Sequence, residues 1–267
     1  MTAVMAIGAG ARAALAASGG LARPLAAFPD APYFDAGGEI VWVGAKLPAR
    51  HPRAVLTATP VERGATLTFG ALPDRGWRAE LPARTDARVV AASARRLVGS
   101  IGALGEPRGF GALLAGRALE FPLDLAVDRV CTLAEAYRGA DPEAVHRASR
   151  ALLGFGTGLT PSGDDLAGGA LFGRMLVSRD GRWRDAGARL ADEARRASHV
   201  ISAALFADLV AGSSFESLHL LADALAAGDD ASALAAAETL ATLGHSSGWD
   251  MLAGVVLGVT GAMKGEG

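Results

Sequence analysis

Two short motifs in the sequence combine residue types that bind ligands or transfer protons. They are Ser162-Gly163-Asp164-Asp165 and Ser247-Gly248-Trp249-Asp250. A serine followed three residues later by an acid is close to a capping box, in which the serine is the N-cap residue and the acid lies in the first turn. The carboxylate then faces the positive end of the helix dipole. The sequence therefore predicts two capped helices with acidic tips.

Both motifs continue with glycines in the same register, so that each stretch reads S-G-x-D-x-x-x-G-x-x-x-G. Gly169 and Gly173 lie four residues apart, as do Gly254 and Gly258, and residues with this spacing share one helix face. Small residues on such a face permit close approach of another backbone. We expect the two helices to pack against each other or against a shared neighbour, with their N-termini at one cavity related by pseudo-twofold symmetry. The alternative is that both are only well-capped core helices.

The loop before the first motif is rich in glycine. Residues 153–165 read L-G-F-G-T-G-L-T-P-S-G-D-D. Glycine lets main-chain N–H groups approach a ligand closely, and a helix N-terminus attracts anionic oxygens. The loop is not a Walker A motif because no lysine follows its last glycine, and no strand clearly precedes it as in a dinucleotide-binding fingerprint. The predicted substrate-binding residues of this loop are Gly156, Thr157, Gly158, Thr160, Ser162 and Gly163.

Asp164 and Asp165 are the first two predicted catalytic residues. Two carboxylates beside an anion-binding loop repel a bare phosphate at close range. Two explanations stay open. The pair holds a divalent cation such as Mg²⁺ that bridges to the ligand, which makes Asp164 and Asp165 candidate metal ligands. Alternatively, the carboxylates accept hydrogen bonds from ligand N–H groups while the loop amides hold a carboxylate or phosphate. A ligand with an amide at one end and an acid at the other suits the second explanation.

The second motif adds His245 as a third catalytic candidate. A histidine is a general acid or base near neutral pH, or donates a hydrogen bond to an anion. A structural role at a helix start is the alternative, but His245 aligns in register with Thr160 of the first loop. The predicted substrate-binding residues around this motif are Ser246, Ser247, Gly248 and Asp250.

A third group of candidates lies in one long helix predicted over residues 184–210. His199, Ser202 and Phe206 share a face by their spacing, and Ser198 precedes Ser202 by four residues. This polar strip either lines a cavity or faces solvent, and we include Ser198, His199 and Ser202 as substrate-binding candidates. The arginine-rich stretch over residues 174–196 is interpreted as a solvated helix face because acids alternate with the arginines.

Composition limits the classes of function. The formal net charge is −2, so no basic surplus favours nucleic-acid binding. The single cysteine, Cys131, excludes an internal disulfide and indicates a reducing, cytoplasmic compartment, and we expect it to be a buried structural thiol. No stretch reaches the ~18 apolar residues of a membrane span. Residues 1–25 lack the basic start of a secretion signal, so we expect a domain helix or a loosely ordered leader there.

The elements that must position these residues predict an α+β fold. Three segments are rich in β-branched and aromatic residues and are separated by Gly and Pro: residues 39–45, 53–58 and 65–70. This pattern indicates a small antiparallel sheet or partial barrel. Residues 77–81 are a further candidate strand. Residues 86–98 have helical character, and the glycine-rich residues 99–123 form a domain junction or a loop that reaches over a site. We expect a β-rich domain over residues 1–124 and a helical bundle over residues 125–267. The predicted bundle helices span residues 125–138, 142–153, 165–177, 184–210, 215–227, 231–243 and 248–263.

At Gly156-Thr-Gly-Leu-Thr-Pro-Ser-Gly-Asp-Asp165 the chain resembles the AllH-type subunit family of oxamate carbamoyltransferase, formerly a domain of unknown function. Residues 244–254 (G-H-S-S-G-W-D-M-L-A-G) resemble the second motif of that family. The resemblance spans the C-terminal half. It implies a subunit of a multi-subunit transferase in purine and allantoin breakdown, which interconverts oxamurate plus phosphate with oxamate plus carbamoyl phosphate. This chain departs from the family at Ser198-His199, where a Thr pair is common, and His199 indicates a different substrate or a variant helix face.

The resemblance leaves two alternatives to a catalytic subunit. One is a metabolite-binding or regulatory subunit without catalysis, and the other is a stand-alone enzyme for another small amide or anionic substrate. The partners predicted are a small-molecule substrate and other subunits of a carbamoyltransferase complex, with no nucleic acid and no membrane. No cofactor other than the candidate Mg²⁺ is predicted.

Overall fold

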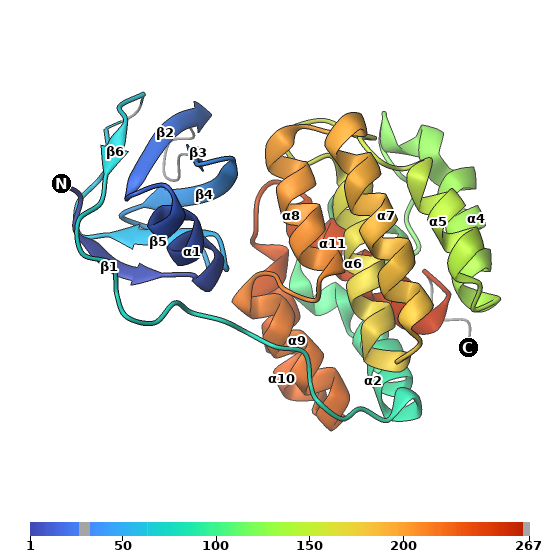
Figure 1. Ribbon diagram of the computed structural model, residues 1–267. Coiled ribbons are helices and arrows are strands. Elements are labelled where there is room, and N and C mark those ends of the chain that lie inside the picture. Colours follow the sequence, from blue (N-terminus) through green and yellow to red (C-terminus); the bar gives the residue numbers. More distant parts are fainter. Residues whose placement is uncertain (27–32, 63, 264–267) are drawn as a thin grey trace. The chain divides into compact units, whose positions relative to one another are not determined.

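The computed structural model describes residues 1–26, 33–62 and 64–263 and has the expected α+β composition (Figure 1). The chain forms two compact units. The first comprises Met1–Ala79 and Ser213–Glu216, and the second comprises Glu80–Gly212 and the chain from Ser217 onward. Residues 80–124 thus pack in the same unit as the helices that carry the two motifs.

The first unit is built on a curled six-stranded sheet with the order β1-β5-β4-β3-β2-β6. Its strands are β1 (Val4–Ile7), β2 (Leu21–Ala26), β3 (Tyr33–Ala36), β4 (Glu39–Gly44), β5 (Ala54–Thr57) and β6 (Leu67–Thr68). Neighbouring strands pair antiparallel except β4 and β5, which are parallel. The expected antiparallel sheet therefore contains one parallel pair.

The N-terminal residues differ most from expectation. Only α1 (Ala9–Ala17) is helical between residues 1 and 25, and the strands β1 and β2 flank it. Strand β2 contains Pro24 and two alanines, so its own propensity for strand is weak, and pairing with β3 and β6 on either side overrides that weakness. Residues 77–81 do not form the further strand, since only an isolated bridge joins Trp77 to Gly8.

Alternation along β4 builds the two faces of the sheet. Val41 and Val43 are fully buried in a core that also holds Leu15 of α1 and Phe34 of β3. Trp42 points to the other face, where its ring stacks on Tyr33 at 6.1 Å between centroids. Helix α1 therefore covers one face, and aromatic side chains cover part of the other.

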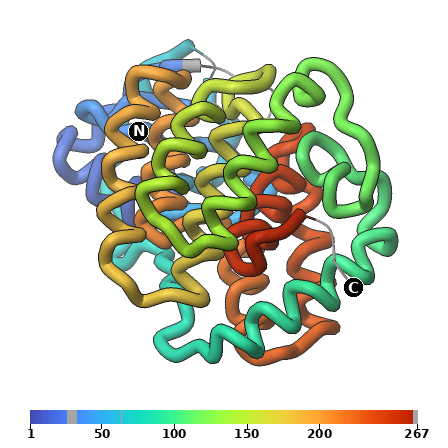
Figure 2. Tube along the Cα trace, turned by 90° about the vertical axis from the view of Figure 1, so that its right-hand side faces the viewer, coloured from blue at the N-terminus to red at the C-terminus, as the bar shows by residue number. Residues whose placement is uncertain are grey.

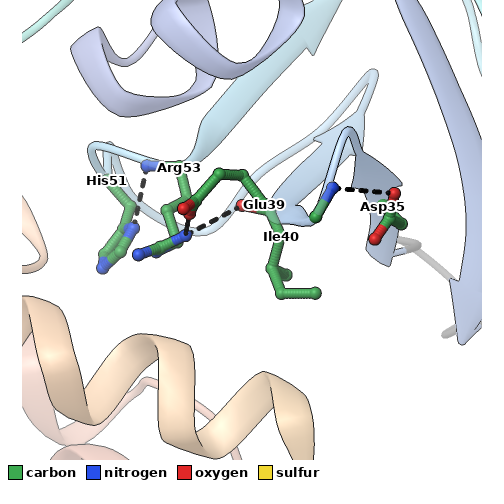
Figure 3. Close-up of polar contacts among 6 residues, drawn as sticks. Asp35, Glu39, Ile40, His51 and Arg53 are labelled. Atoms are coloured by element: carbon green, nitrogen blue, oxygen red, sulfur yellow. Dashed lines mark hydrogen bonds and ion pairs between the residues drawn. The ribbon is translucent and has the colours of Figure 1, made fainter. Parts of the chain in front are cut away.

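Polar contacts of the first unit hold the segment before β5 against β4 (Figure 3). The Nδ1 atom of buried His51 accepts a hydrogen bond from the backbone N–H of Arg53 at 3.1 Å. The Arg53 guanidinium forms an ion pair with Glu39 at 2.9 Å. These contacts give His51 a structural role within the first unit.

The second unit is a helical bundle in which α4 and α5 lie side by side (Figure 2). Its helices are α2 (Ala87–Gly99), α3 (Gly111–Leu114), α4 (Val127–Arg138), α5 (Pro142–Arg150), α6 (Ser162–Val177), α7 (Gly181–Ala197), α8 (Val200–Val210), α9 (Glu216–Ala227), α10 (Asp230–Ala241) and α11 (Ser247–Thr260), with 3₁₀ turns at Ile101–Leu104 and Leu123–Ala126. Nearly every residue of α6 and α11 is buried, which identifies them as the central helices of the bundle.

The prediction of one helix over residues 184–210 is wrong. The chain leaves α7 at Ser198, whose backbone is extended, and begins α8 after His199. The Nδ1 atom of His199 accepts the backbone N–H of Ile201 at 3.3 Å and so caps α8. A side-chain acceptor at this position competes with helix continuation, and the apolar periodicity on either side does not reveal the break.

Two further residues contradict the sequence analysis. Cys131 is exposed on α4 instead of buried. Arg174 is 9% exposed, so the solvated face does not include it. Its guanidinium donates to the Tyr137 carbonyl at 2.7 Å and lies against the rings of Tyr137 and Trp183. Aromatic faces and a helix C-terminus therefore compensate the buried charge.

None of the helices in the described ranges combines the length and apolar character that crossing a membrane requires.

Candidate functional site

The glycines of the two motifs bring α6 and α11 into direct backbone contact. A Cβ atom added to Gly169 would lie 2.6 Å from the Met251 carbonyl oxygen, and one added to Gly173 would lie 2.6 Å from that of Val255. On the other helix, Gly254 and Gly258 pack against backbone atoms of α6 in the same way. The expected packing of the two motif helices against each other is confirmed.

The predicted capping boxes are wrong. Ser162 and Ser247 are the first residues inside their helices, and neither helix has a side-chain cap. Instead, each preceding segment folds back on the helix start: the Gly163 N–H donates to Phe155 O at 2.8 Å, and the Gly248 N–H donates to Leu243 O at 3.0 Å. The segments themselves use these amides, so neither amide is available to a ligand.

The hydroxyl groups at the two helix starts reach across to the other helix. Thr160 Oγ1 and Ser247 Oγ are 2.8 Å apart, and Ser162 Oγ and Ser246 Oγ are 3.4 Å apart. The Ser247 hydroxyl hydrogen-bonds Asp165, and the Ser162 hydroxyl hydrogen-bonds Asp250. Each motif therefore supplies the serine that contacts the acid of the other, which is the pseudo-twofold arrangement expected.

Asp165 and Asp250 form a buried pair of acids, 5% and 0% exposed. Burial raises the pKa of Asp165 well above its usual value, and the charge of Asp250 raises it further, against hydrogen bonds from Ser247 and Thr160. Burial also raises the pKa of Asp250 to about 7, although hydrogen bonds from Phe110 N–H, Ser162 and Ser246 lower it. Their Oδ2 atoms are buried and lack a well-formed hydrogen bond among the described residues. Burial thus favours the protonated form of both carboxyl groups, which suits the pair to proton transfer.

Asp164 points away from this pair and anchors neighbouring segments. Its carboxylate accepts the Gly154 N–H at 2.7 Å and the Ser202 hydroxyl at 2.6 Å, and it also accepts the Ser198 hydroxyl. Ser198 and Ser202 thus contact Asp164 and hold α8 to the start of α6. In the described ranges, no group of three or more His, Cys, Asp or Glu side chains could hold a metal ion. The arrangement of Asp164 and Asp165 therefore adds no support for the Mg²⁺ explanation.

A cleft of about 460 Å³ opens beside the paired helix starts. Thr157 and Ser162 of the first loop line it, together with His245 and Ser246 of the second. The rest of the lining comes from the segment between Glu106 and Leu123, which includes Arg108, Arg117 and Glu120. Four of the predicted site residues therefore line the cleft: Thr157, Ser162, His245 and Ser246. Asp250 is buried and hydrogen-bonds Ser162 and Ser246, whereas buried Asp165 hydrogen-bonds Thr160 and Ser247, which do not line the cleft. His199 is exposed where it caps α8.

The wall from Glu106 to Leu123 contributes residues that sequence reasoning did not select. Phe110 N–H donates to Asp250 Oδ1 at 2.6 Å, which ties the wall to α11. Gly109 adopts a φ of +55°, and a Cβ atom there would overlap the Asp250 carboxylate. The Arg108 guanidinium donates to the His245 carbonyl at 3.3 Å, and Arg117 forms an ion pair with Glu106. Of the two interpretations of residues 99–123, the structure favours the loop that reaches over a site. The glycines of this segment were the feature of the sequence that could have pointed to its contact with Asp250.

Comparison with known proteins agrees with the resemblance of the motifs. Comparison with curated proteins and with solved structures gives no match. A family model described as oxamate carbamoyltransferase subunit AllH matches residues 152–259. The matched range holds both helix starts, the residues that contact Asp164 and the central helices α6 and α11. The part of the chain that builds the paired helix starts is therefore similar to the AllH subunit of oxamate carbamoyltransferase.

Proposed function

We propose that the protein is a subunit of an oxamate carbamoyltransferase-like complex and that its cleft binds a small ligand such as oxamate or carbamoyl phosphate. Both molecules join an –NH₂ group to an anionic group. The match to the AllH family over residues 152–259 supports the assignment to such a complex. A single structural observation carries the ligand proposal: Ser162 and Ser246 meet in a cleft that also contains arginines, directly in front of two buried acids.

The residues of the cleft suit the two ends of such a ligand. Arg108 and Arg117 attract a carboxylate or phosphate, for which guanidinium groups are the preferred partners. Ser162, Ser246 and Thr157 offer hydroxyl groups to the amide end. His245 lies beside them and provides a titratable group in direct contact with the cleft.

The acid pair suits proton transfer in a carbamoyl transfer. In one direction the oxamate nitrogen forms a bond to the carbamoyl carbon, the bond from that carbon to the phosphate oxygen breaks, phosphate leaves, and the nitrogen loses one proton. This step needs a base and a group that stabilises negative charge on the carbonyl oxygen. Asp250 acts as the base through the hydroxyl groups of Ser162 and Ser246, the neighbouring Asp165 raises its affinity for the proton, and the arginines or His245 stabilise the charge.

A second candidate function is ligand binding without chemistry. The observation that favours it is that the predicted catalytic residues Asp164 and Asp165 do not line the cleft. In that case the metabolite binds at the same cleft while a partner subunit performs the reaction. The turnover of the reconstituted complex with Asp165→Asn separates the two candidates, because wild-type turnover by a folded variant would remove this carboxylate from the mechanism.

Calorimetry on the full chain tests the ligand proposal. We expect oxamate and carbamoyl phosphate to bind the wild-type protein, and we expect the double variant Ser162→Ala/Ser246→Ala to bind at least about tenfold more weakly, which corresponds to about 1.4 kcal/mol. Thr239→Ala, an exposed helix position outside the cleft, is the matched control. Absence of binding to the wild-type protein, or unchanged affinity of the double variant, would contradict the proposal.

A further inference from the structure

We propose that Asp250 fixes the direction of the Ser162 and Ser246 hydroxyl groups, so that the floor of the cleft presents hydrogen-bond acceptors and selects a ligand –NH₂ group. This inference rests on the proposed function and deepens it. It assigns the amide end of the ligand to the serines and the anionic end to the arginine-bearing wall. Asp250 is then a positioning residue that determines specificity without contact with the ligand.

The first support is the way in which Asp250 itself is held. Its Oδ1 atom accepts the Phe110 N–H at 2.6 Å, and the residue is fully buried. Its Oδ2 atom has no well-formed hydrogen bond among the described residues. At a pH well above 7, where Asp250 is ionised, its carboxylate accepts hydrogen bonds and donates none. The carboxylate is therefore fixed in place and takes protons from the hydroxyl groups beside it.

The second support is the limited number of protons on the floor. The hydroxyls of Ser162 and Ser246 both hydrogen-bond Asp250 and both line the cleft. A serine hydroxyl carries one proton and two lone pairs, so a serine that donates to a buried carboxylate has only acceptor sites left for a ligand. The two oxygen atoms are 3.4 Å apart, which places two acceptors next to each other. An –NH₂ group supplies two donors to match them.

The third support is the charge of the other residues that line the cleft. Arg108, Arg117 and His245 line the cleft, and the ion pair with Glu106 neutralises Arg117 in part. Glu120 is the remaining carboxylate of the lining. Away from the cleft, the charged group that interacts with Asp250 is the carboxylate of Asp165 on α6. These cations of the lining therefore attract the anionic end of a ligand whose two ends differ.

Isosteric ligand pairs test the inference directly. Pyruvate has the shape and charge of oxamate but carries a methyl group in place of –NH₂, and acetyl phosphate relates to carbamoyl phosphate in the same way. We expect the wild-type protein, at a pH well above 7, to bind the amide member at least about tenfold more tightly than the methyl member, because the methyl group leaves two acceptors unpaired. The readout is the ratio of the two dissociation constants.

Asp250→Asn is the decisive variant. Its side-chain oxygen still accepts the Phe110 N–H, but its –NH₂ group donates to a serine and turns that serine's proton toward the cleft. We expect the ratio to fall to near one, whereas Glu238→Gln, a change at an exposed position of α10, leaves it unchanged. Circular dichroism and thermal unfolding show whether each variant is folded.

The double variant Ser162→Ala/Ser246→Ala removes the acceptors and leaves the carboxylate, so it serves if Asp250→Asn does not fold. Loss of the preference in either folded variant supports the inference. A wild-type protein that binds both members equally, or a folded variant that keeps the wild-type ratio, overturns the inference while the proposed function stands. Binding of neither member by the wild-type protein overturns both.

Discussion

Replacing Gly173 with alanine should push α6 and α11 apart. The added Cβ atom would lie 2.6 Å from the Val255 carbonyl oxygen and 2.9 Å from its Cα atom, whereas ordinary contact begins near 3.4 Å. The two backbones must therefore separate locally by about 0.8 Å, the difference between 3.4 and 2.6 Å. Overpacking of this kind costs roughly 1–3 kcal/mol, and the better helix propensity of alanine returns up to about 1 kcal/mol.

With a cost of about 2 kcal/mol and a return of about 1 kcal/mol, the expected net loss in free energy of unfolding is about 1 kcal/mol, which lowers the melting temperature by roughly 2–4 °C in a chain of this size. Thermal unfolding followed by far-ultraviolet circular dichroism measures the effect. Gly99→Ala is the matched control, since nothing lies within 4 Å of a Cβ atom at this helical position, and we expect it to stabilise the protein slightly. A Gly173→Ala protein at least as stable as the wild type would refute the close packing of the two helices.

Three other predictions concern the acids and the wall of the cleft. Asp164→Ala leaves the Gly154 N–H and two serine hydroxyls without their acceptor, so we expect a loss of roughly 3 kcal/mol in urea unfolding and a looser α8 in hydrogen exchange. Because the pKa of Asp250 is raised to about 7 in the folded protein, the folded state binds more protons than the unfolded state between pH ~4 and pH 7. The free energy of unfolding should therefore fall as pH rises through this window, and Asp250→Asn should make it depend less on pH. An unchanged pH dependence in the variant would contradict the buried acid pair. Arg108→Gln should weaken the binding of oxamate and carbamoyl phosphate in calorimetry and reduce the salt dependence of that binding; equal affinity would show that the anionic end does not lie at this wall.

The sequence pattern predicted the central helix pair because each matched position has the same physical role in both motifs. Gly163 and Gly248 each donate a backbone N–H to the preceding segment, and the paired glycines beyond them allow the helices to touch. The serines were assigned to local capping, but their hydroxyls reach across to the acid of the other helix. A local pattern predicts where each helix begins. It does not predict whether an acid accepts a hydrogen bond from the serine of its own motif or from the serine of the other motif.

Long-range contacts explain what sequence reasoning missed. Phe110 and Asp250 are 140 residues apart, and no spacing rule links a backbone N–H in a glycine-rich segment to a distant carboxylate. The spacing of Arg108 and Arg117 does not link them to the two motifs either. The burial of Arg174 also depends on partners far away in sequence, since its guanidinium meets the ring of Tyr137, which lies on another helix. Propensity and periodicity describe single elements, whereas these features arise when elements pack together.

A crystal structure of the protein with oxamate bound tests the central claim most directly. We expect the oxamate nitrogen within hydrogen-bonding distance of Ser162 Oγ and Ser246 Oγ, and its carboxylate on the side of Arg108. Oxamate bound outside this cleft, or bound in it with the carboxylate on the two serines, would contradict the account.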